Sequence, residues 1–387
     1  MTSRLFTNIG ELFTNDERLG DQTPVGRLRH AAMVVDETRV LWVGEAKRAP
    51  DADECIDVGG AAMLPGFVDS HTHLVFAGER CDEFEARMAG SAYNAGGIER
   101  TVAATRNASD DQLRVESRAR LNALRAGGVT TVEVKSGYCL DVAGERRLVQ
   151  IAGELTDEVT FLGAHVVPLE YRTRRDAYVA LVAGEMMEQC ASATWTDVFC
   201  DQGAFDVDET RSVLEAARAR GHSLRMHANQ IADIGGVALA VEMDCASVDH
   251  LTHLSDNDVE RLASSSTVAT LLPGAEFSTR SKYASGRRLL DSGVTVALAT
   301  DCNPGTSYVT SMSFVIALAV REMSMSVDEA VFAATRGGAL ALRRSDVGHL
   351  AVGARADFVL LDAPRVAHLA YRPGTCLVRD VWCTTTG

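Results

Sequence analysis

The 387-residue sequence predicts a (β/α)8 barrel of the TIM type, with a small β-sandwich domain formed from both termini. Short apolar runs alternate with longer stretches of helical periodicity, and about eight such runs can be counted. Both ends of the chain instead carry strand-like runs without a long helix. We therefore expect the domain built from both termini to cover residues 1–64 and 346–387, and the barrel to cover residues 65–345.

Eight apolar runs supply the predicted barrel strands, and clear helical periodicity lies between several of them, as at residues 208–220 and 328–342. Short apolar runs do not by themselves distinguish a strand from a buried helix, so the count is open by one. The predicted strands are residues 64–69, 129–134, 159–164, 196–200, 224–226, 246–248, 268–272 and 294–299.

The terminal segments have a different pattern. Residues 28–60 contain short apolar runs at 34–35 and 40–43, separated by turn residues, and residues 356–361 form another strand-like run near the C-terminus. Two β-rich ends that flank a barrel predict one small β domain to which both termini contribute.

Composition and charge limit the possible partners. The formal net charge is -15, from 38 basic and 53 acidic residues, which argues against binding to nucleic acid or to an anionic membrane. No apolar run approaches membrane-spanning length, and the N-terminus lacks the apolar segment of a signal peptide. The nine cysteines are scattered and never form a CxxC pair, which favours reduced thiols. We expect a soluble cytoplasmic protein.

The first predicted barrel strand ends in a histidine pair, His71-Thr72-His73. Histidines two residues apart on extended backbone point to the same side, so they can hold one metal ion between them. Such a pair alone is weak evidence, because chance and core packing also produce it.

Further polar side chains follow almost every other predicted strand. Because the carboxyl ends of barrel strands meet at one rim, we expect these residues to gather there, although any single histidine could instead be a core residue bonded to backbone. They are Lys135 and Tyr138 after strand two, His165 after strand three, Asp201 after strand four, His227 after strand five, His250 with His253 after strand six, and Asp301 after strand eight.

This arrangement resembles the amidohydrolase superfamily of metal-dependent hydrolases and deaminases. Local matches extend the resemblance to its imidazolonepropionase family, which acts in histidine degradation. They run from about residue 60 to residue 345 and comprise residues 67–76, 83–90, 101–106, 135–138, 161–165, 249–251 and 299–305.

The resemblance implies a mononuclear metal site. Binuclear members of the superfamily bridge two ions with a lysine or glutamate after strand four, whereas here that strand ends in Cys200-Asp201. Three imidazoles and one carboxylate suit one zinc or iron ion per subunit, which would lower the pKa of a coordinated water to about 7. The implied ligands are His71, His73, His227 and Asp301.

The implied reaction is hydrolysis of the cyclic amide C–N bond of 4-imidazolone-5-propanoate to N-formimidoyl-L-glutamate. Asp301 and His250 would move the proton, although His250 could instead only orient other groups. Arg80 would bind the propanoate carboxylate through two parallel donors, unless it is a surface arginine. The other implied substrate contacts are Tyr138, His165, Gln230, Asn303, Gly305 and Thr306, and for the last three the alternative is ordinary Asn-Pro-Gly turn chemistry.

Several points stay open at this level. The family usually has aspartate where this chain has Asn229, and the segment after Tyr93 is shorter than in the family. Arg106 and Lys135 could be solvated or salt-bridged within the protein, or could contact the substrate carboxylate. The resemblance also implies a homodimer.

The alternative functions are deamination of a purine or pyrimidine base, which needs no carboxylate-binding arginine, and a barrel that only binds or assembles.

Overall fold

A computed structural model describes residues 2–90 and 97–384 of the chain. Tyr93 and the beginning of the shortened segment that follows it lie outside the described residues. The structure divides into two compact units: one comprises Met1–Ser70, Ala123–Thr131 and Ser311–Gly387, and the other comprises His71–Asn122 and Val132–Thr310. No helix within the described ranges combines the length and apolar character needed to cross a membrane.

The predicted barrel is confirmed. An eight-stranded sheet has the sequential order β13-β12-β11-β10-β9-β8-β7-β6, and neighbouring strands from β7 to β13 pair in parallel. A parallel bridge between Thr72 and Cys302 joins the chain after the first strand to the chain after the last, which closes the sheet. The strands are β6 (Phe67–Asp69), β7 (Val129–Lys135), β8 (Glu158–Ala164), β9 (Trp195–Cys200), β10 (Ser223–Ala228), β11 (Ser247–His250), β12 (Val268–Leu271) and β13 (Val296–Leu298).

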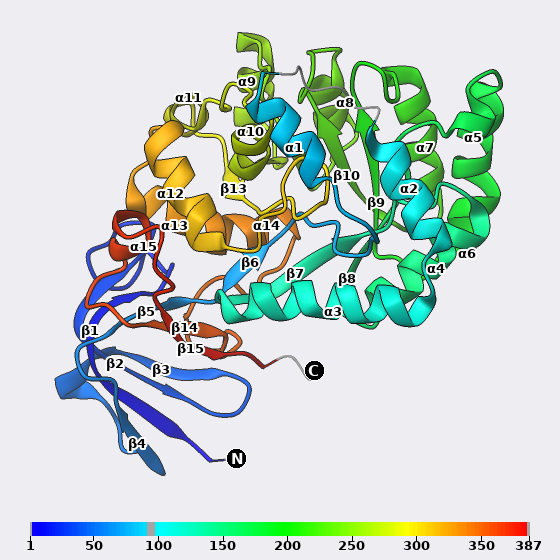
Figure 1. The fold of residues 1–387 in the computed structure, drawn as a ribbon. Coiled ribbons are helices and arrows are strands. Elements are labelled where there is room, and N and C mark those ends of the chain that lie inside the picture. The colour runs from blue at the N-terminus through cyan, green and yellow to red at the C-terminus, as the bar shows by residue number, and fades with distance from the viewer. Residues whose placement is uncertain (1, 91–96, 385–387) are drawn as a thin grey trace. The chain divides into compact units, whose positions relative to one another are not determined.

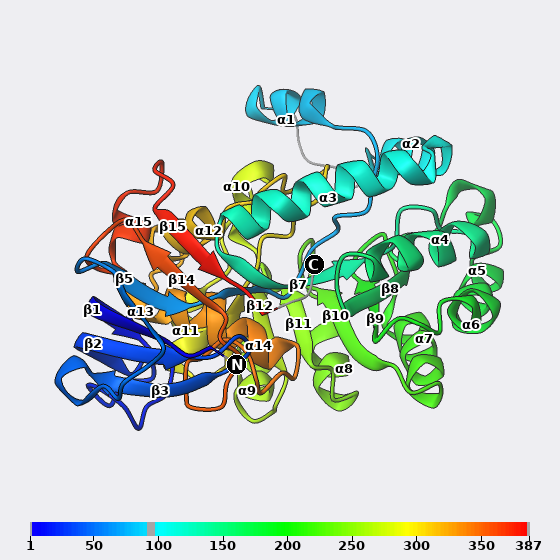
Figure 2. The same ribbon diagram turned by 90° about the horizontal axis from the view of Figure 1, so that it is seen from below.

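Each barrel strand is followed in sequence by at least one helix, and Figures 1 and 2 show α4 and α7 lying outside β8 and β9. Capping boxes begin several of the helices: in α7, Asp206 and Glu209 each accept from the other's backbone N–H. The helices are α1 (Cys81–Met88), α2 (Ile98–Asn107), α3 (Asp110–Ala126), α4 (Val142–Gly153), η3 (Leu169–Tyr171), α5 (Arg175–Leu181), η4 (Val182–Met186), α6 (Met187–Gln189), α7 (Val207–Ala219), α8 (Gly236–Glu242), α9 (Asp256–Ala263), α10 (Pro273–Thr279) and α11 (Gly286–Asp291).

A second sheet is built from both ends of the chain, as the sequence predicts (Figure 1). Its order is β15-β14-β5-β1-β2-β3, with β4 paired to β1. The apolar cluster on it includes Phe6, Ile9, Met33 and Phe358, all at most 1% exposed. The strands are β1 (Arg4–Phe13), β2 (Arg27–Val35), β3 (Val40–Glu45), β4 (Glu54–Asp57), β5 (Ala62–Pro65), β14 (Phe358–Leu361) and β15 (Val378–Trp382).

The same unit contains the remaining helices, η1 (Ala46–Arg48), α12 (Met312–Glu322), α13 (Val327–Phe332), η5 (Ala333–Gly337), α14 (Gly338–Ala341) and α15 (His368–Tyr371). The helical pattern at 328–342 thus corresponds to α13, a π-helical turn and α14. The predicted domain boundaries at 64/65 and 345/346 stay predictions.

The single strand expected at residues 64–69 is wrong in one respect. The chain forms two strands there, β5 in the terminal sheet and β6 in the barrel sheet, divided at Gly66. A Cβ at Gly66 would lie 2.2 Å from Oγ1 of Thr130, so only glycine allows this close approach. Pattern alone could not show the change of sheet, because both halves of the run are buried.

Candidate active site

The histidine pair is fixed against the end of the last barrel strand. His71 O accepts from the backbone N–H of Asp301, and the backbone N–H of His73 donates to Cys302 O, both at 3.0 Å. These bonds place the aspartate after strand eight beside the histidines after strand one. The sequence prediction that these ends meet at one rim is therefore met by direct backbone contacts.

The four predicted ligands lie close together and are at most 3% exposed. Asp301 Oδ1 lies 3.5 Å from Nε2 of His71 and 3.5 Å from Nε2 of His73. The Nε2 atoms of His73 and His227 are 3.4 Å apart. Possible ligand atoms of His71, His73 and Asp301 all lie within 4.8 Å of one another, and the same holds for His71, His227 and His250.

Two buried aspartates orient the imidazoles for metal binding. His71 Nδ1 donates to Asp249 Oδ2 at 2.7 Å, and His227 Nδ1 donates to Asp197 Oδ1 at 3.0 Å. A carboxylate that accepts a hydrogen bond from Nδ1–H fixes the tautomer in which Nε2 has a lone pair for a metal ion. Nε2 of His71 is buried without a hydrogen-bond partner among the described residues. This donor set fits a metal ion, and the buried orphan nitrogen is the observation that supports the fit.

Burial also sets the protonation of these groups. It lowers the pKa of His71, His73 and His250 well below the ordinary 6.5, so these imidazoles are neutral near pH 7. Burial raises the pKa of Asp301 well above its ordinary value. Neutral imidazoles are the form that binds a metal ion, and a cation beside Asp301 favours its ionised form.

His250 and Asp301 share an unusual backbone conformation. Their φ angles are +82° and +51°, in the left-handed region that non-glycine residues seldom adopt. Such conformations cost about 1–3 kcal/mol and are concentrated at functional sites. His250 is the last residue of β11 and its side chain reaches the pocket, whereas His253, three residues on, is exposed and does not line it.

One pocket brings together all the implied metal ligands, proton-transfer groups and substrate contacts except His71, which is fully buried and does not line it. Three further residues line this pocket and were not predicted: Ile98, Val166 and Phe199. They give the pocket apolar walls, and nothing in their local sequence distinguishes them from ordinary core positions. The predicted residues in the lining are His73, Arg80, Tyr138, His165, His227, Gln230, His250, Asp301, Asn303, Gly305 and Thr306.

Arg80 is a pocket residue and not a surface arginine, since only 6% of it is exposed. Its Nε and Nη2 donate to Glu83 at 2.8 and 2.7 Å, which leaves Nη1 without a partner among the described residues. A Cβ on Gly305 would lie 2.3 Å from Nη1, so glycine at this position makes room for the guanidinium. The two-donor fork expected for the substrate is thus partly used by Glu83.

His165 and Tyr138 form one wall of the pocket. The His165 ring stacks on His73 at 5.3 Å and its Nδ1 donates to Gly137 O at 2.9 Å. Burial lowers its pKa to about 3, so the ring is neutral. The loop with Tyr138 is held by buried Glu145, whose carboxylate accepts from the backbone N–H of Gly137, Cys139 and Leu140 at 2.7–2.8 Å. Glu145 was not predicted from the sequence.

Asp201 holds the loop that carries Gln230. Its carboxylate accepts from the backbone N–H of Gln230, Ile231 and Ala232 at 2.7–3.0 Å. Asn229 is directed away from the pocket: its Nδ2 donates to His253 O at 2.6 Å, and its backbone O accepts from the His253 N–H. Its φ of +57° is one that asparagine tolerates well. The side chain of Asn229 therefore links the loop after β10 to the loop after β11 by a hydrogen bond.

The segment from Asn303 to Thr306 shows the turn chemistry that the sequence left as an alternative. Asn303 Oδ1 accepts from the backbone N–H of Gly305 and of Thr306, at 2.8 and 2.7 Å. Thr306 Oγ1 also lies 3.4 Å from Asp301 Oδ2. These backbone donors are thus engaged within the turn, and the turn places Thr306 beside the carboxylate.

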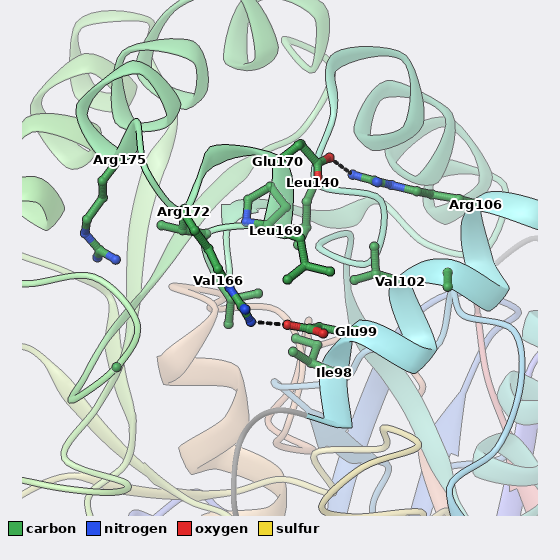
Figure 3. A pocket seen from close by; sticks show the side chains of 14 residues that line it. Ile98, Glu99, Val102, Arg106, Leu140, Val166, Leu169, Glu170, Arg172 and Arg175 are labelled. Atoms are coloured by element: carbon green, nitrogen blue, oxygen red, sulfur yellow. Dashed lines mark hydrogen bonds and ion pairs between the residues drawn. The ribbon is translucent and has the colours of Figure 1, made fainter.

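Arg106 lies outside the metal pocket, in a neighbouring cavity of about 420 Å³. Figure 3 shows it paired with Glu170 on one side of this cavity, while Arg172 pairs with Glu99 on another. Arg106 also donates to Cys139 O at 2.7 Å. Of the two possibilities left open by the sequence, the structure supports a salt-bridged role.

Lys135 is likewise an ion-paired residue, and its expected place at the rim is wrong. It is fully buried, and its Nζ lies 2.8 Å from Glu133 and 2.8 Å from Asp197. Although burial opposes its charge, these carboxylates raise its pKa. The residues that orient the site and were missed in the sequence are Glu133, Asp197, Arg225 and Asp249; the available signal was a charged residue inside an apolar strand.

Known proteins match this chain over almost all of its length. The amidohydrolase family matches residues 62–384. The imidazolonepropionase of Mycolicibacterium smegmatis is 59% identical over 383 residues, covering 98% of this chain and 96% of its own. That of Salinispora arenicola is 60% identical over 385 residues, covering 98% and 97%.

Solved structures share the fold at low identity. A variant of atrazine chlorohydrolase from Arthrobacter aurescens, complexed with zinc and atraton, superposes with a TM-score of 0.72 at 19% identity, covering 98% of this chain and 94% of its own. A zinc-bound adenosine deaminase from Xanthomonas campestris gives a TM-score of 0.70 at 18% identity, covering 98% and 91%.

Proposed function

The chain belongs to the amidohydrolase family and, within it, to the imidazolonepropionases, and from this we propose the reaction that its pocket performs. It hydrolyses the cyclic amide C–N bond of 4-imidazolone-5-propanoate and yields N-formimidoyl-L-glutamate, as a metal-dependent hydrolase that acts on a small molecule. The observation that carries the proposal is the pocket in which His73, His227 and Asp301 lie with Arg80.

We propose that one ion, zinc or iron, is held by His71, His73, His227 and Asp301. When bound, the ion supplies Lewis-acid chemistry and lowers the pKa of a coordinated water to about 7. Asp249 and Asp197 keep the imidazoles of His71 and His227 in the tautomer that offers Nε2.

Proton transfer needs two groups near the reacting bond, one to take a proton from water and one to return it to the leaving nitrogen. Asp301 Oδ1 faces the imidazoles, so Oδ2, beside Thr306 Oγ1, is the oxygen that takes the proton. His250 lines the same pocket as Asp301, and its neutral imidazole has a ring nitrogen with a lone pair that can take up this proton and return it to the leaving nitrogen. We assign the two roles to Asp301 and His250 together.

Substrate recognition follows from the pocket walls. Nη1 of Arg80 binds the propanoate carboxylate, with a charge-assisted hydrogen bond. Tyr138 and the neutral His165 contact the imidazolone ring from one wall, and Gln230 contacts its polar edge. The Asn303 turn, with Gly305 and Thr306, lines the pocket beside Asp301.

The test combines metal analysis with two assays on the purified protein. We expect about one zinc or iron per chain and turnover of 4-imidazolone-5-propanoate, with no turnover of guanine or cytosine. Deamination of a base without turnover of the imidazolone would refute the substrate, and absence of a stoichiometric metal would refute the metal-dependent reaction. A homodimer, a cytoplasmic location and the lack of nucleic-acid binding stay predictions; light scattering tests the first.

A further inference from the structure

A cluster of five charged side chains lies buried beneath the metal pocket. It consists of three carboxylates and two cations, and none of the five has any exposed surface: Glu133, Lys135, Asp197, Arg225 and Asp249. Charged groups are almost never fully buried unless they are paired, so their arrangement serves either the fold or the site above it.

Lys135 joins the two carboxylates that hold different metal-ligand segments. Its Nζ lies 2.8 Å from Glu133 Oε1 and 2.8 Å from Asp197 Oδ2. Glu133 Oε2 accepts from the backbone N–H of Thr72, the residue between His71 and His73, at 3.1 Å. Asp197 Oδ1 accepts from both Nδ1 and the backbone N–H of His227, at 3.0 and 3.1 Å.

The backbone reinforces the same connection at the histidine pair. The Lys135 N–H donates to Thr72 O at 3.0 Å, and Thr72 Oγ1 donates to Glu133 O at 2.6 Å. These hydrogen bonds from β7 fix the residue between the two histidines. From these bonds to Thr72, a continuous path of contacts runs through the Lys135 ammonium and Asp197 to the ring of His227. The ammonium is therefore placed to couple the histidine pair to the third imidazole.

We propose that Lys135 is a positioning residue that sets the spacing between the His71/His73 pair and His227, and thereby the affinity of the site for its metal ion. The inference rests on the proposed ligand set. A lysine that only neutralised buried charge would stabilise the barrel without setting this spacing. The two roles therefore predict different metal affinities for a variant that keeps the net charge of the cluster but loses the contacts of Lys135 with Glu133 and Asp197.

The first variant is Lys135→Met, which keeps the length of the side chain and removes its charge. Loss of a residue that orients metal ligands typically weakens metal binding by about 10- to 100-fold. We expect this loss in a chelator competition with zinc, together with a changed visible spectrum of the cobalt-substituted protein, which reports ligand geometry. The matched control is Lys282→Met, at an exposed lysine, which should leave affinity and spectrum unchanged.

The second variant, Glu133→Gln with Lys135→Met, separates the two roles. The wild-type cluster has three carboxylates and two cations, and the double variant has two carboxylates and one cation, so the net charge stays at one negative. We expect thermal stability to recover toward wild type while metal affinity stays about 10- to 100-fold weaker. Recovery of both would overturn the proposal, and so would wild-type affinity in Lys135→Met. A wild-type protein that binds no metal would instead overturn the ligand set itself.

Discussion

Replacing Arg80 by alanine tests how the pocket recognises the substrate carboxylate. Because Nε and Nη2 of Arg80 already donate to Glu83, the substrate gains chiefly the bond from Nη1. One hydrogen bond to a charged group contributes about 1.5–3 kcal/mol, which corresponds to a loss of about 10- to 150-fold in kcat/KM. A full two-donor fork would predict a larger loss.

Arg100→Ala is the matched control for this variant. Arg100 Nη1 pairs with Asp82 at 2.7 Å and lies 3.6 Å from the same Glu83, but its side chain is 54% exposed and does not line the pocket. Glu83 keeps a cation nearby in either variant, so its own charge is not stranded. We expect Arg100→Ala to retain wild-type kinetics.

The assay compares 4-imidazolone-5-propanoate with an analogue that carries an ethyl group in place of the propanoate. Arg80→Ala should lose activity, mainly through KM, on the first compound and not on the second, with bound metal unchanged. An equal loss on both compounds would show that Arg80 shapes the pocket and does not recognise the carboxylate. Loss of metal would show that it supports the ligands.

Three further predictions concern pH, the Gln230 loop and the metal. Burial raises the pKa of Glu276 from 4.5 to about 8, so above pH 4.5 the folded state keeps a proton that the unfolded chain releases. The contribution of this group to the free energy of unfolding is fully present below pH 4.5 and falls by on the order of 5 kcal/mol as the pH rises to about 8. Glu276→Gln should remove this part of the pH dependence in urea unfolding at pH 5 and pH 8, and an unchanged pH dependence would refute the assignment. Asp201→Ala should raise KM about 10-fold with metal content unchanged, because the loop that carries Gln230 loses three hydrogen bonds to the carboxylate. A 10-fold change corresponds to about 1.4 kcal/mol, which is less than three such bonds together contribute. Unchanged kinetics would mean that the loop keeps its conformation without Asp201. His73→Ala should lose metal and activity together, and full metal content by elemental analysis would exclude it as a ligand.

The identities of the ligands could be predicted from the sequence because each depends on local pattern. His71, His73, His227 and Asp301 directly follow or end apolar runs, and the carboxyl ends of parallel strands meet at one rim. The Asn303 turn was also visible as Asn-Pro-Gly chemistry. Local pattern leaves open which donors are already used, and only the structure shows Glu83 holding two nitrogens of Arg80.

The buried charges could not be placed in the same way. Glu133 and Lys135 alternate with valines in β7, and a period of two puts them on one face of the strand. Both faces of a barrel strand are buried, however, so alternation does not tell whether that face points into the barrel or toward the helices. Lys135 could be expected at the rim for this reason, and the structure places it below the rim between two carboxylates.

Each of two ligands is oriented by a strand other than its own. Asp249 on β11 holds His71, which follows β6; Asp197 on β9 holds His227 on β10. The local sequence therefore indicates which residue is a ligand, whereas the order of strands around the barrel determines how that residue is oriented. Closure of the barrel and formation of the metal site are for this reason one event, because the imidazoles acquire their tautomer and direction only when the closed sheet has brought these strands into position. Metal binding should accordingly stabilise the closed sheet as a whole and not the loops after its strands.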